Sequence, residues 1–193
     1  MRVMHCSWSH LVALADVACS RGRQAERRLV AELGRYLRGV MTMQDLTSNW
    51  TYCVSLSWKT PDGWAISLRD VVLTKGRYFH PYGSGGGWPK VPPNYVAFRW
   101  NGYVQQVNHV EGYVVTDELH EVISEIPAGE TWTPHIVYRL GPAIPLAAPL
   151  PSGTNYRASR FWVALDLLLT SPTLKDALVE TRARTAASSD EPE

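Results

Sequence analysis

The residue pair Asn101-Gly102 constrains the fold of this chain more than any other feature. The pair lies inside residues 95–115, between two runs in which apolar and polar residues alternate. Asn and Gly both tolerate a positive φ, which a two-residue type I′ turn needs at both central positions. The chain is therefore predicted to form a β-hairpin whose tip is these two residues.

A two-residue tip also predicts the register of the hairpin. Counting outwards gives the expected pairs, which are Trp100 with Tyr103, Phe98 with Gln105, Val96 with Val107, and Asn94 with His109. This register puts Gln105 and His109 on the apolar face, beside the rings of Phe98 and Trp100. Tyr95 and Arg99 fall on the reverse face, a solvated or ligand-facing surface. Arg99 could contact a phosphate there, but it should contribute little to a base held beside Phe98 and Trp100.

The spacing of apolar residues is helical up to Asp45, alternating after it, and helical again from about residue 157. Helices are expected at 8–19, 22–40 and 157–169, a further helix from residue 171, and strands at 50–58, 64–68 and 135–140. We therefore expect an α+β fold, a small bent antiparallel β-barrel-like sheet of five to seven strands flanked by N- and C-terminal helices. The expected parts are a helical appendage (1–45), a β-rich domain with closing helices (46–180) and a disordered tail (181–193).

The composition excludes several classes of protein. The 193 residues carry a net charge of +1, so nucleic-acid binding would need a local basic patch and not a global field. The three cysteines are scattered and the six histidines lack the spacing of metal ligands, so we expect no metal site. The sequence contains no phosphate-binding motif, so we expect no cofactor. No run approaches about 18 apolar residues and no apolar signal core begins the chain, so we expect a cytoplasmic protein without a membrane partner.

Two other regions hold candidate binding residues. The glycine-rich loop at 81–93 contains Trp88 and Lys90, and loops often carry function. The predicted helix at 22–40 has arginines outside its apolar stripe, among them Arg28 and Arg35. Clustered arginines can release counterions from a nucleic-acid backbone, and they can also be an ordinary solvated face.

Residues 94–98 (NYVAF) through 108–111 (NHVE) resemble the hairpin of PUA-like domains of the EVE and ASCH types, which occur alone or fused to restriction-type nucleases. Residues 135–142 resemble the later strand of these domains and residues 157–177 their closing helices, so the resemblance covers about residues 50–178. It implies a strongly bent β-barrel that binds nucleic acid, sometimes around a modified or flipped-out base.

We therefore expect a nucleic-acid-binding module, with DNA rather than RNA as ligand and with a nuclease or other defence protein as a further partner. Base recognition needs aromatic faces for stacking and polar groups aimed at base edges. The candidate binding residues are Trp88, Lys90, Tyr95, Trp100, Gln105, His109, Arg28 and Arg35.

Two other functions stay open on the sequence alone. The eight tryptophans could form a protein-interaction surface, because Trp and Arg concentrate at such interfaces. A small hydrolase could use His109 and Glu111, two residues apart on one strand, as base and partner. No nucleophile motif accompanies them, so we expect a binding protein rather than an enzyme.

Overall fold

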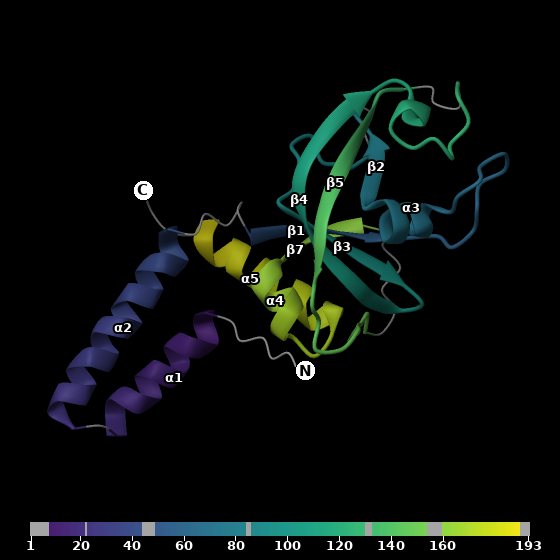
Figure 1. The fold of residues 1–193 in the computed structure, drawn as a ribbon. Helices are drawn as coiled ribbons and strands as arrows, with labels where there is room; N and C mark the ends of the chain where they lie inside the picture. Colours follow the sequence, from purple (N-terminus) through teal and green to yellow (C-terminus); the bar gives the residue numbers. More distant parts are fainter. Residues whose placement is uncertain are drawn as a thin grey trace.

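The computed structural model describes residues 8–21, 23–43, 49–83, 86–129, 133–153 and 160–189. A curled, open half-barrel of mixed β-sheet is flanked by helices from both ends of the chain (Figure 1). The predicted α+β class, with a bent sheet between N- and C-terminal helices, is thereby confirmed.

The sheet has the strand order β2-β5-β4-β3-β1-β7. Its strands are β1 (Trp50–Ser55), β2 (Arg77–Pro81), β3 (Tyr95–Trp100), β4 (Tyr103–Thr116), β5 (His135–Ile144) and β7 (Arg160–Ala164), and the short β6 (Leu150–Pro151) pairs with the start of β4. All neighbours are antiparallel except β1 and β3, which run parallel. β1 therefore joins the hairpin to the last strand of the chain.

Helices lie at both ends of the sequence and beside the sheet. They are α1 (Trp8–Arg21), α2 (Gln24–Met43), α3 (Leu68–Lys75), α4 (Leu165–Thr170) and α5 (Leu174–Ser189), with a 3₁₀ turn η2 (Leu119–Glu121). α1 and α2 agree with the helices predicted at 8–19 and 22–40. They pack against each other as an antiparallel hairpin that stands apart from the sheet in Figure 1.

The sheet is buried on both faces at its centre. One face, with Cys53 and Ala97, packs against α4 and α5. The other face is largely aromatic and includes Tyr52 and Phe98. β1 was predicted as a half-buried strand at 50–58, and this is wrong in two respects: it ends at Ser55, and its residues 51–54 are buried on both sides. The two separate cores explain the double burial.

The hairpin tip is confirmed. Asn101 has φ 51° and Gly102 has φ 79°, as the predicted turn between β3 and β4 requires. Trp100 pairs with Tyr103, also as predicted.

The rest of the predicted hairpin register is wrong by one residue. The pairing shifts between Phe98 and Arg99, so that Phe98 lies opposite Gln106 and Arg99 opposite Val104. Gln105 is thus the extra residue of a β-bulge, and a bulge reverses which residues beyond it face the core. Tyr95 consequently pairs with His109.

Three other predicted elements are also wrong. Residues 64–68 form no strand; instead Ser67 caps α3, accepting a hydrogen bond from the Asp70 backbone N–H at 3.1 Å. The helix expected at 157–169 is β7 followed by α4 over the described residues 160–169, because residues 160–164 pair with β1; residues 157–159 lie outside the described residues. The strand expected to end at Gly141-Pro142 continues to Ile144.

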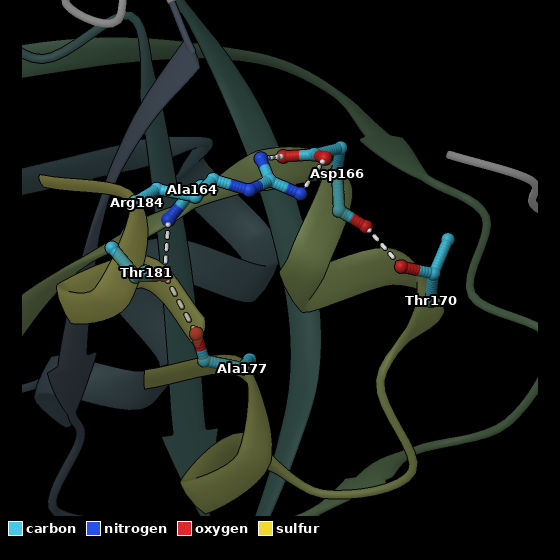
Figure 2. Close-up of polar contacts among 6 residues, drawn as sticks. All are labelled: Ala164, Asp166, Thr170, Ala177, Thr181 and Arg184. Carbon is cyan, nitrogen blue, oxygen red and sulfur yellow. Dashed lines mark hydrogen bonds and ion pairs between the residues drawn. The ribbon is translucent and has the colours of Figure 1, made fainter. Parts of the chain in front are cut away.

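The tail predicted as disordered from residue 181 is helical as far as Ser189. Figure 2 shows why the helix continues. Arg184 donates two hydrogen bonds to the Asp166 carboxylate, at 3.0 and 2.8 Å, and Thr181 Oγ1 accepts one from the Ala164 backbone N–H at 3.2 Å. These contacts attach α5 to α4 and to the end of β7. Residues 190–193 of the predicted tail lie outside the described residues.

Candidate functional site

A polar pocket opens at the tip of the β3–β4 hairpin, and we call it the hairpin-tip pocket. Its volume is about 630 Å³. Backbone hydrogen bonds hold its walls: Leu56 N–H donates to Arg99 O at 2.9 Å, and Ser152 N–H donates to Gly102 O at 2.8 Å. The lining residues are Ser55, Leu56, Ser57, Trp58, Arg99, Trp100, Asn101, Gly102, Ser152 and Gly153.

A buried guanidinium lines this pocket. Arg99 is only 7% exposed, and its Nε and Nη2 donate to Ser55 Oγ at 3.0 and 2.5 Å. The guanidinium carbon lies 5.6 Å from the ring centroid of Phe161. Contacts on two sides therefore fix the orientation of a permanent positive charge. The reverse face was expected to be solvated or ligand-facing; Arg99 is instead buried there, and it lines a pocket.

Two tryptophans and several hydroxyl groups complete the pocket lining. Trp58 is 66% exposed and Trp100 is half-buried. The buried Ser152 Oγ has no hydrogen-bond partner among the described residues. A buried polar atom is normally satisfied, so this hydroxyl could donate to or accept from a bound group. The lining thus combines a fixed cation, aromatic faces and hydrogen-bonding groups.

The predicted juxtaposition of Gln105 and His109 with Phe98 and Trp100 is not found. The polar side chains on the face of Phe98 are Gln106 and Asn108, which are joined by a hydrogen bond of 2.8 Å. The buried Asn108 also donates to Gly141 O at 2.8 Å. Gln105, at the bulge, reaches the Trp100 carbonyl at 3.5 Å.

His109 and Tyr95 form a separate pair on the outer side of the hairpin. Their rings meet edge to face with centroids 5.3 Å apart, and His109 is exposed. Neither residue lines the hairpin-tip pocket. His109 and Glu111 also have different partners, since the Glu111 carboxylate lies 3.6 Å from Arg139 Nε. This geometry gives the hydrolase alternative no support.

Trp88, from the glycine-rich loop, is enclosed between two other side chains. Its ring stacks on His80 with centroids 5.0 Å apart and an angle of 3° between the planes. The Arg160 guanidinium covers it at 3.8 Å from the ring centroid, and Arg160 also donates to Gly86 O. Both faces of the indole are therefore occupied, and in this arrangement Trp88 has no face left for a ligand.

His80, beneath Trp88, is held in its neutral form. Its Nδ1 lies 2.8 Å from Pro81 O, which can only accept, so Nδ1 carries the proton and Nε2 accepts from the Tyr138 hydroxyl at 2.8 Å. Burial lowers the pKa of His80 below 6.5. His80 thus belongs to the aromatic core of the half-barrel and is neutral at pH 7.

Lys90 lines a second pocket, which is apolar and has a volume of about 570 Å³. Trp50 and Trp162, whose rings meet edge to face at 6.3 Å, form one side of it. The remaining lining residues are Val91, Pro92 and Pro93. We call this the Trp50–Trp162 pocket. The sequence-predicted residues Lys90 and Trp100 therefore belong to two different pockets.

Arg28 and Arg35 are exposed on α2. Arg28 Nε lies 3.4 Å from Glu32 Oε1, one helical turn away. The eight predicted binding residues are consequently distributed over two pockets, the outer hairpin, the core below the loop, and α2.

Several other chemistries find no candidate within the part of the chain that the structure describes. No group of three or more His, Cys, Asp or Glu side chains there is arranged to hold a metal ion. No described helix is both long and apolar enough to cross a bilayer. Burial raises the pKa of the Cys53 thiol to about 12, so Cys53 is not a nucleophile.

Comparison of the chain with models of protein families, with curated proteins and with solved structures finds no match in any of the three. The resemblance to PUA-like domains accordingly stays a prediction.

Sequence reasoning missed Trp58, Ser152 and the burial of Arg99. Trp58 lies beyond the end of β1, where the alternating pattern had suggested that the strand continues. Ser152 approaches the hairpin only through the pairing of β6 with β4. One signal was available, because an arginine within an otherwise apolar strand, between Phe98 and Trp100, is costly unless it is held in a specific site.

Proposed function

We propose that this protein is a nucleic-acid-binding module that holds one unpaired or extruded nucleotide, of DNA rather than RNA, in the hairpin-tip pocket. The observation that carries the proposal is the buried Arg99 guanidinium in a pocket that also contains Trp58 and Trp100. A nuclease or defence partner, implied by the PUA-like resemblance, belongs to the same proposal.

The guanidinium supports the phosphate part of this proposal. Arg presents planar N–H donors that match phosphate oxygens, and hydrogen bonds between charged groups are stronger than neutral ones. In Arg99 the orientation is already fixed by Ser55 and Phe161, so little side-chain entropy is lost on binding. The net charge of +1 agrees with recognition through one fixed cation and not through a general basic surface.

Trp58 and Trp100 support the proposal that the pocket holds the base of the nucleotide. A base stacked on an aromatic side chain contributes about 1–3 kcal/mol, independently of sequence. A stacked base inside a pocket cannot stay paired in a duplex, so the ligand would be single-stranded or carry an extruded nucleotide. The hydroxyls of Ser57 and Ser152 and the Asn101 amide supply donors and acceptors for base edges.

The test is fluorescence anisotropy with labelled single-stranded DNA, a duplex, a duplex with one unpaired nucleotide, and RNA of the same sequence. Trp58→Ala should weaken binding of the single strand about 10- to 100-fold, because stacking is lost. Trp58 is largely exposed, so stability should hardly change. Tyr113→Ala removes a 59% exposed aromatic ring outside the pocket and serves as the matched control.

A second variant tests the cation. Arg99→Gln should reduce the slope of log affinity against log salt by about one, since one phosphate contact is lost. Circular dichroism confirms that the variant is folded. Binding of all four nucleic acids by Trp58→Ala and Arg99→Gln with wild-type affinity would contradict the proposed site.

A protein-interaction domain is the second candidate, and the Trp50–Trp162 pocket favours it. Tryptophans and prolines around an apolar pocket are typical of sites for extended peptide segments. Association through this pocket would depend weakly on salt, in contrast to nucleic-acid binding. Loss of protein association in Trp162→Ala, with nucleic-acid affinity unchanged, would separate the two functions.

A further inference from the structure

The α1–α2 hairpin has little core of its own. Among its described side chains, Ala15 on α1 and Leu37 on α2 are the buried apolar ones. Val17 on α1 is 52% exposed, and five other large apolar side chains are 37–69% exposed, namely Leu11, Leu14, Leu29, Leu33 and Tyr36. Helices in proteins are stabilised mainly by packing of an apolar face, so a hairpin that buries so little is marginal alone.

These exposed side chains form two stripes. A helix turns about 100° per residue, which places Leu29, Leu33 and Tyr36 within about 60° of arc on α2. Leu11 and Leu14 also lie within about 60° on α1. The buried residues Leu37 on α2 and Ala15 on α1 mark the side of each helix that faces the other helix. On both helices the stripe is rotated away from this buried residue, and the sense of rotation about the helix axis is the same. Because the two helices are antiparallel, both stripes emerge on one side of the hairpin.

The described arginines of α2 lie away from this apolar face, whereas Glu26 and Glu32 flank its stripe on α2. On the same helical projection Arg27, Arg28 and Arg35 point to the sides and back of the hairpin, and all three are exposed. Two such apolar faces could therefore meet without opposing arginines, and the Glu26 carboxylate at the edge of the face already accepts a hydrogen bond from the Arg23 N–H at 2.8 Å. The side of the hairpin that could associate carries the exposed apolar side chains of both helices.

We propose that this face binds a second copy of the chain, and that two hairpins form a symmetric four-helix bundle. The same face on both chains gives an isologous two-fold interface, the commonest arrangement of homo-oligomers. The five side chains expose roughly 500 Å² per chain, so their complete burial in a pair would remove about 1,000 Å², which is the lower limit for a biological interface. The dimer would carry two hairpin-tip pockets, and its existence does not depend on what those pockets bind.

Sedimentation velocity over a range of micromolar concentrations tests the dimer. The wild-type chain should reach twice the mass of one chain. Leu33→Glu should weaken association at least about a hundredfold, because a carboxylate would be buried in the bundle. Ala31→Glu puts the same charge on an exposed position at the back of α2 and should leave the dimer intact. A monomeric wild type, or a dimer that survives Leu33→Glu, would overturn the proposal.

Hydrogen exchange of the wild-type chain gives a test that needs no variant. Protection of amides in α1 and α2 should rise with protein concentration, while protection of β3 should not. Equal protection of the hairpin at high and low concentration overturns the dimer. A monomer that binds vesicles or another protein through this face would also overturn the dimer. Nucleic-acid binding in the anisotropy assay tests the proposed function and is independent of these outcomes.

Discussion

Removing Arg184 should weaken the attachment of α5 to α4 and destabilise the domain. Its two nitrogens donate to both oxygens of Asp166 (Figure 2). The side chains are 36% and 21% exposed, so the pair is neither a solvated ion pair nor a fully buried one. Exposed pairs contribute about 0–1 kcal/mol, and breaking buried ones costs about 3–5 kcal/mol. We expect Arg184→Ala to lower the free energy of unfolding by about 1–2 kcal/mol.

Urea unfolding followed by tryptophan fluorescence measures this change, and the corresponding fall in Tm is roughly 2–8 °C. Arg182→Ala is the matched control, since Arg182 is exposed on the same helix and the substitution changes helix propensity equally. Its effect should stay within about 0.5 kcal/mol. A double-mutant cycle with Asp166→Ala should give a coupling energy of at least about 0.5 kcal/mol. Equal stability of the Arg184 and Arg182 variants would refute the reasoning.

Three further changes test the hairpin and the core below the loop. Gly102→Val places a β-branched residue at φ 79° and should cost about 1–3 kcal/mol, with an unchanged Tm pointing to a different turn. Asn108→Ala should lower the free energy of unfolding by about 1–3 kcal/mol in urea because Gly141 O loses its donor, whereas His109→Ala should be nearly neutral. A larger loss for His109→Ala than for Asn108→Ala would instead support the hairpin register predicted from the sequence. Burial lowers the pKa of His80 from 6.5, so the contribution of its neutral form to stability is complete above about pH 6.5 and is lost as the pH falls through the lower pKa of the folded state. Urea unfolding at about pH 7.5 and about pH 5 should therefore show a loss of stability at the lower pH. The loss should be smaller in His80→Gln.

The hairpin tip was predictable because its cause is local. Asn101 and Gly102 accept positive φ whatever surrounds them, so the turn follows from two adjacent residues. The bulge at Gln105 has no comparable local signal. Gln105 and Gln106 are chemically identical, so the local sequence does not show which of them is the extra residue. In the observed register Asn108 is buried and donates to Gly141 O, a contact between distant parts of the chain.

Long-range pairing explains the remaining errors at the ends of the β domain. Phe161 and Leu165 have helical spacing, but the free edge of β1 holds residues 160–164 extended. The start of α3 does have a local signal, because Ser67 followed by Asp70 is a pattern typical of helix N-termini. The prediction of a strand at 64–68 did not take this pattern into account. The candidate site was only partly predictable for the same reason: Trp100 and Arg99 are local to the hairpin, whereas Trp58 and Ser152 reach it through tertiary structure.

The position of β1 has a consequence for how this protein is made. β1 is an early strand of the sheet, yet one of its two edges pairs with β7, the last strand of the chain. During synthesis on a ribosome, Tyr52 and its neighbours leave the exit tunnel long before Trp162 exists to pair with them. The nascent sheet must therefore keep an open edge until β7 emerges, and folding of the half-barrel should be completed only after residues 160–164 have left the tunnel. Truncations that end before β7 should leave that edge unprotected and prone to aggregate.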